Sequence, residues 1–278
     1  MISFTKMHGV GNDYIYINCL TGEIPDPASL SIRMSDRHFG IGSDGLILIL
    51  PSSIADFRMR MFNSDGSESG MCGNGIRCFA KYLFDRGLCG KTVSIESGGK
   101  IKNIELIAEN GKASGAVVDM GEPEAERRLV PMNGPEGRVI SEPLAMKDGT
   151  VFNITCVSMG NPHTVIYVDD VKNFPVGVYG PEIETSPLFP ARTNVEFVTV
   201  INDSEVIQRT WERGAGETLA CGTGASAVCA AGVLAGKTKR TIVSHLSGGD
   251  LRLSWSEETN HLSMSGPAVE VFEGSWSS

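Results

Sequence analysis

The chain carries the phrase Cys72-Gly73-Asn74-Gly75 in its first half and the phrase Cys221-Gly222-Thr223-Gly224 in its second half. Each phrase leads into an apolar run containing alanine, which predicts a helix. The two cysteines are 149 positions apart (221 minus 72). One such phrase is typical of a tight turn next to a buried cysteine. Two matching phrases indicate two matching half-molecules, each carrying a thiol at the same place.

Other features repeat at the same offset of 149 positions, without gaps. They include a glutamate followed by serine or threonine, an aromatic residue, a glycine at the end of a predicted helix and a Gly-Asn pair. The matched positions are Glu68-Ser69 with Glu217-Thr218, Phe62 with Trp211, Gly87 with Gly236, and Gly11-Asn12 with Gly160-Asn161. We therefore predict a duplicated chain of two homologous halves, each of ordinary domain size.

Composition narrows the class of protein. The 278 residues are 41% hydrophobic, which is enough to form two substantial cores. The net charge of −9 argues against a general nucleic-acid binder, because such proteins present a basic face. The apolar runs predict no membrane span, and Met1–His8 lacks the pattern of a secretory leader. Seven cysteines are an odd number that indicates free thiols in a reducing compartment, so we expect a cytoplasmic protein.

Hydrophobic patterning predicts an α+β fold rich in strands. Asp26-Pro27 is a helix start, with a capping carboxylate and a proline in the first turn, so a helix is expected over 28–37. Alternation is clear over 57–62 and 195–200. Gly121–Gly137, rich in proline and glycine, is the expected junction of the halves. Further strands are expected over 14–17, 93–97, 102–108, 116–120, 152–157, 164–167, 241–245, 251–255 and 269–272.

Each repeated cysteine stands where a glycine-rich turn enters a helix. Backbone N–H groups at a helix start carry partial positive charge, so they favour a thiolate and bind carboxylates. Zinc ligation is a poor alternative, since the nearest pair, Cys72 and Cys78, has five residues between its members and would point to different faces of a helix. We therefore expect no metal site, and we read Cys78 and Cys229 as core positions of the two helices.

Two opposed thiols suit the inversion of an amino-acid α-carbon. One sulfur removes the α-hydrogen as a base, and the other returns a proton to the opposite face as an acid. Helix N-termini converging on the substrate carboxylate would stabilise the carbanion. This chemistry requires no cofactor.

The motifs as a set resemble diaminopimelate epimerase, over essentially the whole chain. They are Gly11-Asn12-Asp13, Phe62-Asn63-x-Asp65-Gly66, Met71-Cys72-Gly73-Asn74-Gly75-x-Arg77-Cys78, Ser158-Met159-Gly160-Asn161-Pro162-His163, Asn194 and Glu212-Arg213-Gly214-x-Gly216-Glu217-Thr218-x-Ala220-Cys221-Gly222-Thr223-Gly224.

The resemblance implies two pseudo-symmetric lobes, each a mixed, barrel-like sheet curled around a central helix, with the active site in the cleft between them. The first lobe would span 1–120 and regain a returning strand at about 267–278, and the second would span 121–266. The implied reaction interconverts LL- and meso-2,6-diaminopimelate for lysine and peptidoglycan synthesis. The substrate is the implied partner, and the chain could form a homodimer.

The resemblance also implies a role for each site residue. Cys72 would be the base for the LL substrate and Cys221 the acid, while His163 and Glu212 would tune the two thiols. Main-chain N–H groups would hold the reacting carboxylate, three groups would hold the reacting ammonium, and four side chains would hold the distal end. The first set is Gly73, Asn74, Gly222 and Thr223; the second is Asn63, Glu212 and the Arg213 carbonyl; the third is Asn12, Asn161, Asn194 and the Arg213 guanidinium.

One position departs from the family pattern. Asn194 falls on Gly45 at the 149 offset, where some members of the family carry glutamine. Any substrate contact from that glutamine is absent or replaced in this chain.

Three alternative functions stay open at this level. A proline racemase or hydroxyproline epimerase also carries Cys-Gly-x-Gly phrases, but it typically has a histidine at the position of Asn74 and a different run before the second thiol. An isomerase of the phenazine-biosynthesis type would have the same fold without the thiol pair. A non-catalytic redox sensor or anion-binding module is the third. For single residues such as Asn12, Asn161 and Asn194, an ordinary turn role is also consistent with the sequence.

Overall fold

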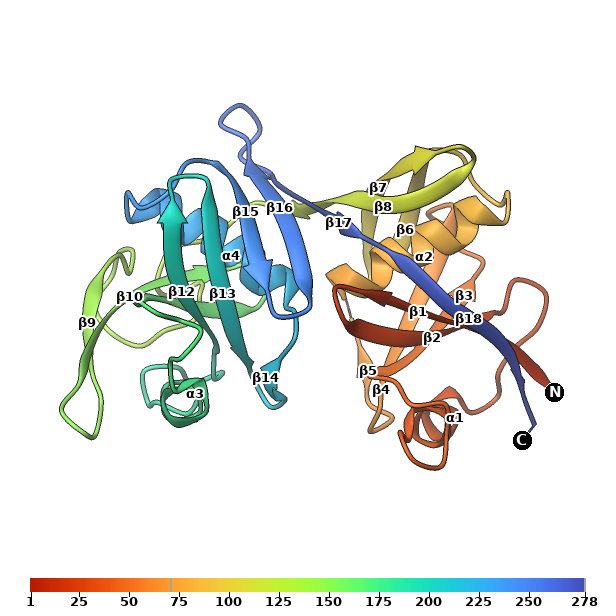
Figure 1. Ribbon diagram of the computed structural model, residues 1–278, viewed down its shortest axis with the longest axis horizontal. Coiled ribbons are helices and arrows are strands. Elements are labelled where there is room, and N and C mark those ends of the chain that lie inside the picture. Colours follow the sequence, from red (N-terminus) through yellow and green to blue (C-terminus); the bar gives the residue numbers. More distant parts are fainter. Residues whose placement is uncertain (71, 278) are drawn as a thin grey trace. The chain divides into compact units, whose positions relative to one another are not determined.

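The computed structural model describes residues 1–70 and 72–277. Met71, which precedes the first thiol in its motif, and Ser278 lie outside the described residues. The chain divides into two compact units, which we call unit 1 (Met1–Asp119 with Ser265–Ser278) and unit 2 (Met120–Met264). Strands dominate both units and helices are few, so the α+β class predicted from the sequence is confirmed (Figure 1).

Unit 1 is built on one mixed sheet. Its elements are β1 (Ile2–Gly9), β2 (Asn12–Asn18), α1 (Pro27–Ser35), β3 (Gly45–Leu50), β4 (Phe57–Asn63), β5 (Glu68–Ser69), α2 (Gly73–Asp85), β6 (Thr92–Ser97), β7 (Lys100–Glu109), β8 (Lys112–Gly121) and β18 (Val269–Trp276). The strands pair in the order β18-β1-β2-β3-β4-β6-β7-β8, with β5 also on β4. The β2–β3 and β4–β6 pairs are parallel, and the others are antiparallel.

Unit 2 repeats this plan. Its elements are β9 (Glu142–Ala145), β10 (Val151–Ser158), β11 (Pro162–Tyr167), α3 (Val176–Glu184), β12 (Asn194–Asn202), β13 (Glu205–Glu212), β14 (Gly216–Thr218), α4 (Gly222–Leu234), β15 (Thr241–Leu246), β16 (Gly249–Trp255) and β17 (Leu262–Pro267), whose last residues belong to unit 1. The order is β9-β10-β11-β12-β13-β15-β16, with β14 on β13. The parallel pairs are β11–β12 and β13–β15, which correspond to those of unit 1.

The 149-residue offset found in the sequence holds for whole elements. It relates α2 to α4, α1 to α3 and β6 to β15, residue for residue at both ends. Each central helix is followed by a glycine in the left-handed region, Gly87 at φ 70° and Gly236 at φ 65°. A side chain is disfavoured in that conformation, which explains why glycine stands at both helix ends.

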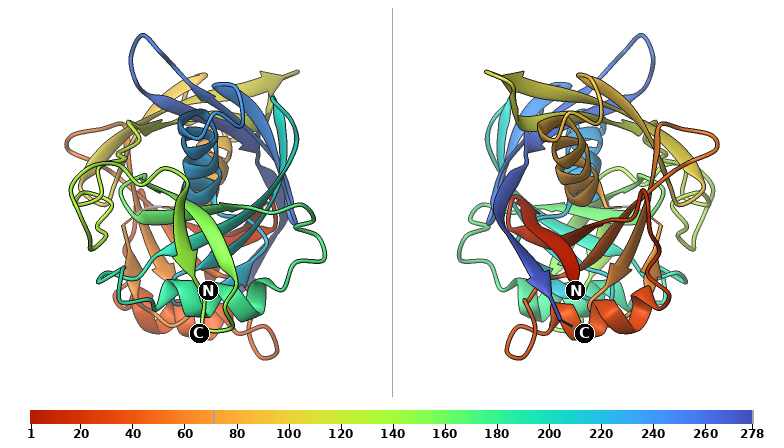
Figure 2. Two further views of the ribbon diagram at one scale, coloured as in Figure 1. Left: turned by 90° about the vertical axis from the view of Figure 1, so that its left-hand side faces the viewer. Right: turned by 90° about the vertical axis from the view of Figure 1, so that its right-hand side faces the viewer.

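In each unit one helix lies inside the curled sheet (Figure 2). α4 packs against β10, β11, β12, β15 and β16, and α2 packs against β1, β2, β7 and β18. A helix enclosed in this way is mostly apolar around its circumference, and buried polar side chains such as Arg77 of α2 are hydrogen-bonded. The small residues of Gly222–Leu234 fit this pattern, and Cys78 and Cys229 are buried in the two helices as the sequence predicted.

The second face of each sheet is covered by the other helix of its unit. α1 packs on β3 and β4, and α3 on β12, β13 and β14. Asp26 caps α1 by accepting a hydrogen bond from Ser29 N at 3.1 Å, as predicted, although α1 ends at Ser35. Because strands such as β3 are covered on both faces, their sequences are continuously apolar.

The chain returns to unit 1 at its C-terminal end. β18 runs antiparallel to β1, from Ile2 opposite Trp276 to His8 opposite Val269. Arg86, just after α2, anchors this strand by ion pairs with Glu270 and Glu273. Within the described residues, no helix is long and apolar enough to cross a membrane.

Candidate active site

Cys72 is the N-cap residue of α2. Its backbone is extended, with φ −138° and ψ 114°, and its sulfur accepts a hydrogen bond from Gly75 N at 3.3 Å. The helix begins at Gly73, so the glycine-rich phrase forms the first turn. Helix geometry leaves the first N–H donors of such a turn without acceptors inside the helix. The sulfur therefore lies at the positive end of the helix dipole.

Asn12 connects the Cys72 sulfur to a network of charges. Its Oδ1 lies 3.2 Å from Cys72 Sγ and 3.4 Å from Asn74 Nδ2. Its own Nδ2 donates to Asp44 Oδ2 at 2.7 Å. Asp44 also pairs with Arg37 at 2.9 Å, so the orientation of Asn12 is fixed by an ion pair behind it.

Arg77 supports the first turn of α2 from inside unit 1. Its side chain is fully buried and donates to Asn74 Oδ1 at 3.0 Å, to Gly73 O at 3.1 Å and to Pro267 O at 3.4 Å. Burial lowers the pKa of the guanidinium. Arginine is nevertheless so strongly basic that it stays protonated in proteins. A positive charge thus stands beneath the Cys72 turn.

Cys221 caps α4 in the same manner. Its φ is −125° and its ψ 111°, and its sulfur accepts from Gly224 N at 3.4 Å. Thr223 Oγ1 lies 3.4 Å from the sulfur. Burial raises the pKa of this thiol well above its ordinary value, and the nearby carboxylates of Glu212 and Glu196 raise the pKa further. Cys221 is therefore a neutral thiol near pH 7.

Glu212, at the end of β13, faces Cys221. It accepts a hydrogen bond from Thr218 Oγ1 at 2.6 Å and interacts with the Cys221 thiol. Burial raises the pKa of Glu212 above its usual range. A buried carboxyl next to a thiol is suited to proton exchange with it.

His163 lies behind the Cys221 site, between two oxygen atoms. Its Nε2 is 3.0 Å from Asn161 Oδ1, and its Nδ1 is 2.8 Å from Glu196 Oε1. Asn161 in turn donates to Thr223 Oγ1 at 3.4 Å. His163 and Glu196 are both fully buried. The structure thus connects His163 to Cys221 through Asn161 and Thr223.

Asn194 and Arg213 are joined to each other. Arg213 N donates to Asn194 Oδ1 at 2.9 Å, while Asn194 Nδ2 donates to Pro162 O at the same distance. Arg213 Nη1 donates to Ala191 O at 2.8 Å. Asn194 thereby holds the turn that follows Glu212.

Asn63 and Gly45 show how the half-sites differ. Asn63, the equivalent of Glu212, is held in its own hairpin by a hydrogen bond to Ser67 Oγ at 2.9 Å. Gly45, the equivalent of Asn194, has no room for a side chain: an added Cβ would lie 2.1 Å from Phe62 O and 3.0 Å from Tyr14 Cε1. A glutamine at this position would require the strands to move apart.

Sequence reasoning missed several side chains of these clusters. The strand predicted over 195–200 is confirmed as part of β12, but Glu196 was not recognised as a buried side chain, and Asn194–Val198 is buried throughout. A carboxylate within an apolar segment was the available signal. The other missed side chains are Tyr14, Asp44, Arg77 and Thr218.

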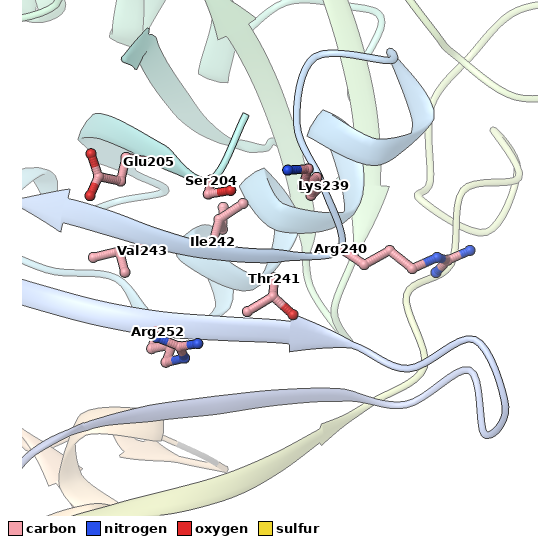
Figure 3. Close-up of a pocket in the computed structure, with 8 residues that line it drawn as sticks. All are labelled: Ser204, Glu205, Lys239, Arg240, Thr241, Ile242, Val243 and Arg252. Atoms are coloured by element: carbon pink, nitrogen blue, oxygen red, sulfur yellow. The ribbon is translucent and has the colours of Figure 1, made fainter. Parts of the chain in front are cut away.

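A cavity of about 530 Å³ opens elsewhere on unit 2 (Figure 3). Its lining residues all differ from those around Cys221; they are Ser204, Glu205, Lys239, Arg240, Thr241, Ile242, Val243 and Arg252. The two thiol clusters are therefore recognised by their chemistry and not by this cavity.

Solved structures with the same fold include proteins of several activities. A phenazine biosynthesis protein from Bacillus anthracis matches with a TM-score of 0.69 at 16% identity, covering 98% of both chains. A probable proline racemase from Agrobacterium radiobacter matches with a TM-score of 0.71 at 14% identity, covering 100% of this chain and 93% of that chain. At such low identity these likenesses show the fold alone.

Sequence relatives are much more similar. A diaminopimelate epimerase from Acetivibrio thermocellus is 55% identical over 272 residues, covering 98% of this chain and 97% of the relative. One from Methanococcus maripaludis is 54% identical over 274 residues, covering 98% and 99%. The family model for diaminopimelate epimerase matches residues 4–126 and 155–271, which contain both thiol phrases and all the side chains around them. The chain belongs to the diaminopimelate epimerase family.

Proposed function

We propose that this protein interconverts LL- and meso-2,6-diaminopimelate, with Cys72 and Cys221 as the two acid–base groups. The observation that carries this proposal is the equivalence of the thiols. Each caps a helix of 13 residues, and each sulfur accepts the N–H three residues ahead. Two such sulfurs suit a reaction in which a proton leaves one face of a carbon and another arrives at the opposite face.

In the LL-to-meso direction, Cys72 acts as the thiolate base. It removes the α-proton, and the bonding electron pair stays on the carbon, delocalised into the carboxylate. The Cys221 thiol then gives its proton to the opposite face and becomes a thiolate. The raised pKa of Cys221 supports this assignment, because the group is protonated before the reaction. The meso-to-LL direction exchanges the two roles.

The difficult step is formation of the carbanion, since an amino-acid α-proton is far less acidic than a thiol. We propose that the helix starts supply the stabilisation, with Gly73, Asn74, Gly222 and Thr223 donating backbone N–H groups to the substrate carboxylate. Donors fixed in advance around a developing charge lower a barrier without reorganising during the step.

The remaining polar groups position the two ends of the substrate. Asn63, Glu212 and the Arg213 carbonyl hold the reacting ammonium group, and Glu212 also exchanges a proton with Cys221. The distal amino-acid end is held by Asn12, Asn161, Asn194 and the Arg213 guanidinium. We propose that one lobe, 1–120 with about 267–278, carries Cys72 and that the other lobe, 121–266, carries Cys221.

The cellular setting completes the proposal. The product serves lysine and peptidoglycan synthesis, and the enzyme works in the cytoplasm without a cofactor and without nucleic acid. It acts as a homodimer, which light scattering at several protein concentrations tests.

The decisive experiment is solvent hydrogen exchange. The protein is incubated with LL-diaminopimelate in deuterated water without added cofactor, and the products are separated by stereochemistry. We expect meso product carrying one deuterium at the inverted α-carbon. Replacing either Cys72 or Cys221 by alanine should lower the rate of epimerisation by at least about 100-fold.

A matched control is Cys89→Ala, because Cys89 is partly exposed and follows the C-terminal end of α2, whereas Cys72 caps its N-terminal end. This variant should keep full activity. Undiminished epimerisation by either active-site cysteine variant would overturn the two-thiol mechanism. Proline or hydroxyproline turnover in place of diaminopimelate turnover would overturn the substrate assignment.

A further inference from the structure

A row of hydrogen-bonded side chains leads from the Cys221 sulfur to a carboxylate that the proposed reaction does not use. Thr223 Oγ1 lies 3.4 Å from Cys221 Sγ and 3.4 Å from Asn161 Nδ2. Asn161 Oδ1 lies 3.0 Å from His163 Nε2, and His163 Nδ1 lies 2.8 Å from Glu196 Oε1. The row ends there, since among the described residues Glu196 Oε2 has no hydrogen-bond partner.

The buried end of the row is cut off from solvent. His163 and Glu196 are both 0% exposed, and an uncompensated charge at such a depth is costly. The Glu196 carboxyl group and the His163 ring therefore compensate each other through the 2.8 Å contact between Oε1 and Nδ1.

The Asn161 amide nitrogen donates to Thr223, so its oxygen faces His163 Nε2 and can only accept, which makes Nε2 the donor. The Nε2 proton is donated to Asn161 Oδ1, which holds the Asn161 amide nitrogen toward Thr223. Thr223 Oγ1 accepts from Asn161, so its hydroxyl proton remains available for the sulfur. We infer that the His163–Glu196 pair orients this row of donors toward Cys221 and thereby stabilises the Cys221 thiolate.

Such stabilisation matters for one direction of the reaction. Cys221 must be the base when meso substrate reacts, yet burial and the carboxylates of Glu212 and Glu196 oppose its ionisation. The charged or titratable groups that face the sulfur are Glu212 from β13, Glu196 from β12 and, through Asn161, His163 from β11. The features that favour the thiolate are the Gly224 N–H at the helix start and the row that ends in Thr223.

The arrangement is specific to unit 2. Glu196 lies under the first turn of α4, where a Cβ added to Gly224 would be 2.6 Å from Glu196 Oε1. The equivalent residue in unit 1 is Ile47, and a Cβ on Gly75 would meet its Cδ1 at 2.8 Å. His163 is likewise replaced by Tyr14. The first turn of the central helix therefore contacts the carboxyl group of Glu196 in unit 2 and the aliphatic side chain of Ile47 in unit 1.

The inference rests on the proposed function only in taking Cys221 as an acid–base group, and its test needs no substrate. In a Cys72→Ser background, the rate of alkylation of Cys221 by iodoacetamide is measured from about pH 6 to about pH 11, with the Cys221 peptide quantified by mass spectrometry. Only the thiolate reacts, so the midpoint of the rate profile reports the acidity of the thiol.

The test variant is Glu196→Gln. A glutamine oxygen accepts from His163 Nδ1–H, which leaves Nε2 as an acceptor. The Asn161 amide then reverses, Thr223 donates to Asn161 and no longer to sulfur, and alkylation below the midpoint becomes about tenfold slower. Loss of the negative charge alone would have the opposite sign and speed the reaction. A glutamine whose amide nitrogen donates to Nδ1 would preserve the row, so the result that overturns the inference is an unchanged or faster rate in both Glu196→Gln and Thr223→Val.

Two further variants separate the row from general disruption. Thr223→Val removes the hydroxyl group next to the sulfur, so it should slow the alkylation of Cys221 by a similar factor. In the double variant with Glu196→Gln, the rate should be no lower than in either single variant. It also carries the test if Glu196→Gln does not fold. Glu184→Gln is the control, because Glu184 is a buried carboxylate of unit 2 that bonds Trp211 Nε1 and Gly214 N and stands outside the row. It should leave the profile unchanged. Additive effects of Glu196→Gln and Thr223→Val would count against a shared row, whatever the epimerase assay shows.

Discussion

Tyr14 and His163 occupy equivalent positions in the two units. Tyr14 pairs with Gly45 across the parallel strands β2 and β3, and His163 pairs with Asn194 across β11 and β12. Burial and the nearby Cys72 raise the pKa of Tyr14, so it stays neutral, whereas His163 faces a buried carboxylate. Gene duplication thus preserved the backbone, while the side chains around the thiols diverged. A substrate with one reacting end and one fixed end requires such a difference.

The first prediction concerns the glycine in the first turn of each central helix. Gly224→Ala should destabilise the protein by about 2 kcal/mol, because its Cβ would lie 2.6 Å from Glu196 Oε1. Gly75→Ala should cost about 1 kcal/mol, since it meets only the flexible end of Ile47. Urea unfolding of both variants checks the order. Equal losses would mean that Glu196 can move aside without cost.

The second prediction concerns pH. Glu212 must be ionised to hold an ammonium group or to accept a proton from Cys221. Burial raises its pKa, so kcat/KM should fall with decreasing pH at values above the ordinary 4.5 of a glutamate. Glu212→Gln should lower kcat/KM by about 100-fold and abolish this acidic limb. Glu217→Gln, which removes a partly exposed ion pair with Arg209, is the control and should keep the limb. An acidic limb that persists in Glu212→Gln would assign it to another group.

The third prediction concerns alkaline stability. Burial raises the pKa of Cys78 to about 11 and the pKa values of Cys156 and Cys229 to about 12, from 9.0. In the unfolded chain these thiols ionise near pH 9, so the unfolded state loses protons first and stability falls as pH rises from about 9 toward 11. Each thiol contributes a slope of about 1.4 kcal/mol per pH unit.

Unfolding free energies at about pH 8, 9 and 10 measure this slope. In the Cys229→Ala variant, the free energy of unfolding should fall less steeply with pH, by the contribution of one thiol. This difference in slope is expected even if the variant is less stable at every pH. Tyrosines and lysines titrate in both proteins, so they cancel in the comparison. Identical slopes would contradict the buried-thiol explanation.

The fourth prediction concerns the returning strand. Deletion of residues 269–278 takes away the partner of β1 and the ion pairs of Arg86. We expect a loss of at least about 4 kcal/mol, at about 1 kcal/mol for each lost hydrogen bond. Hydrogen exchange should show that amide protection disappears in β1 and remains in β12. A chain ending at Trp276 is the control. Retained protection of β1 in the shorter chain would show that β18 is dispensable.

Local signals made much of the fold predictable. The cap at Asp26, the phrases that open α2 and α4, and the alternation of β4 all depend on residues close in sequence. α3 was missed, because Val176–Glu184 contains Pro181 and two glycines and has no side-chain cap at Pro175. Its apolar residues Val176 and Ile183 pack into the core of unit 2, so tertiary burial outweighs poor helix propensity.

The sequence by itself determined the duplication, the equivalence of Cys72 and Cys221 and the family. These follow from residue identities at a constant spacing, which requires no coordinates. Only the tertiary structure revealed that Glu196 is buried and that it meets His163, Asn161 and Thr223 in one row. Those residues come from two strands, the loop before β11 and a helix, and hydrogen bonds form only where the parallel register of β11 and β12 and the start of α4 bring the atoms within about 3 Å. Spacing along a chain cannot specify such distances, so the surroundings of each thiol are a property of the folded units.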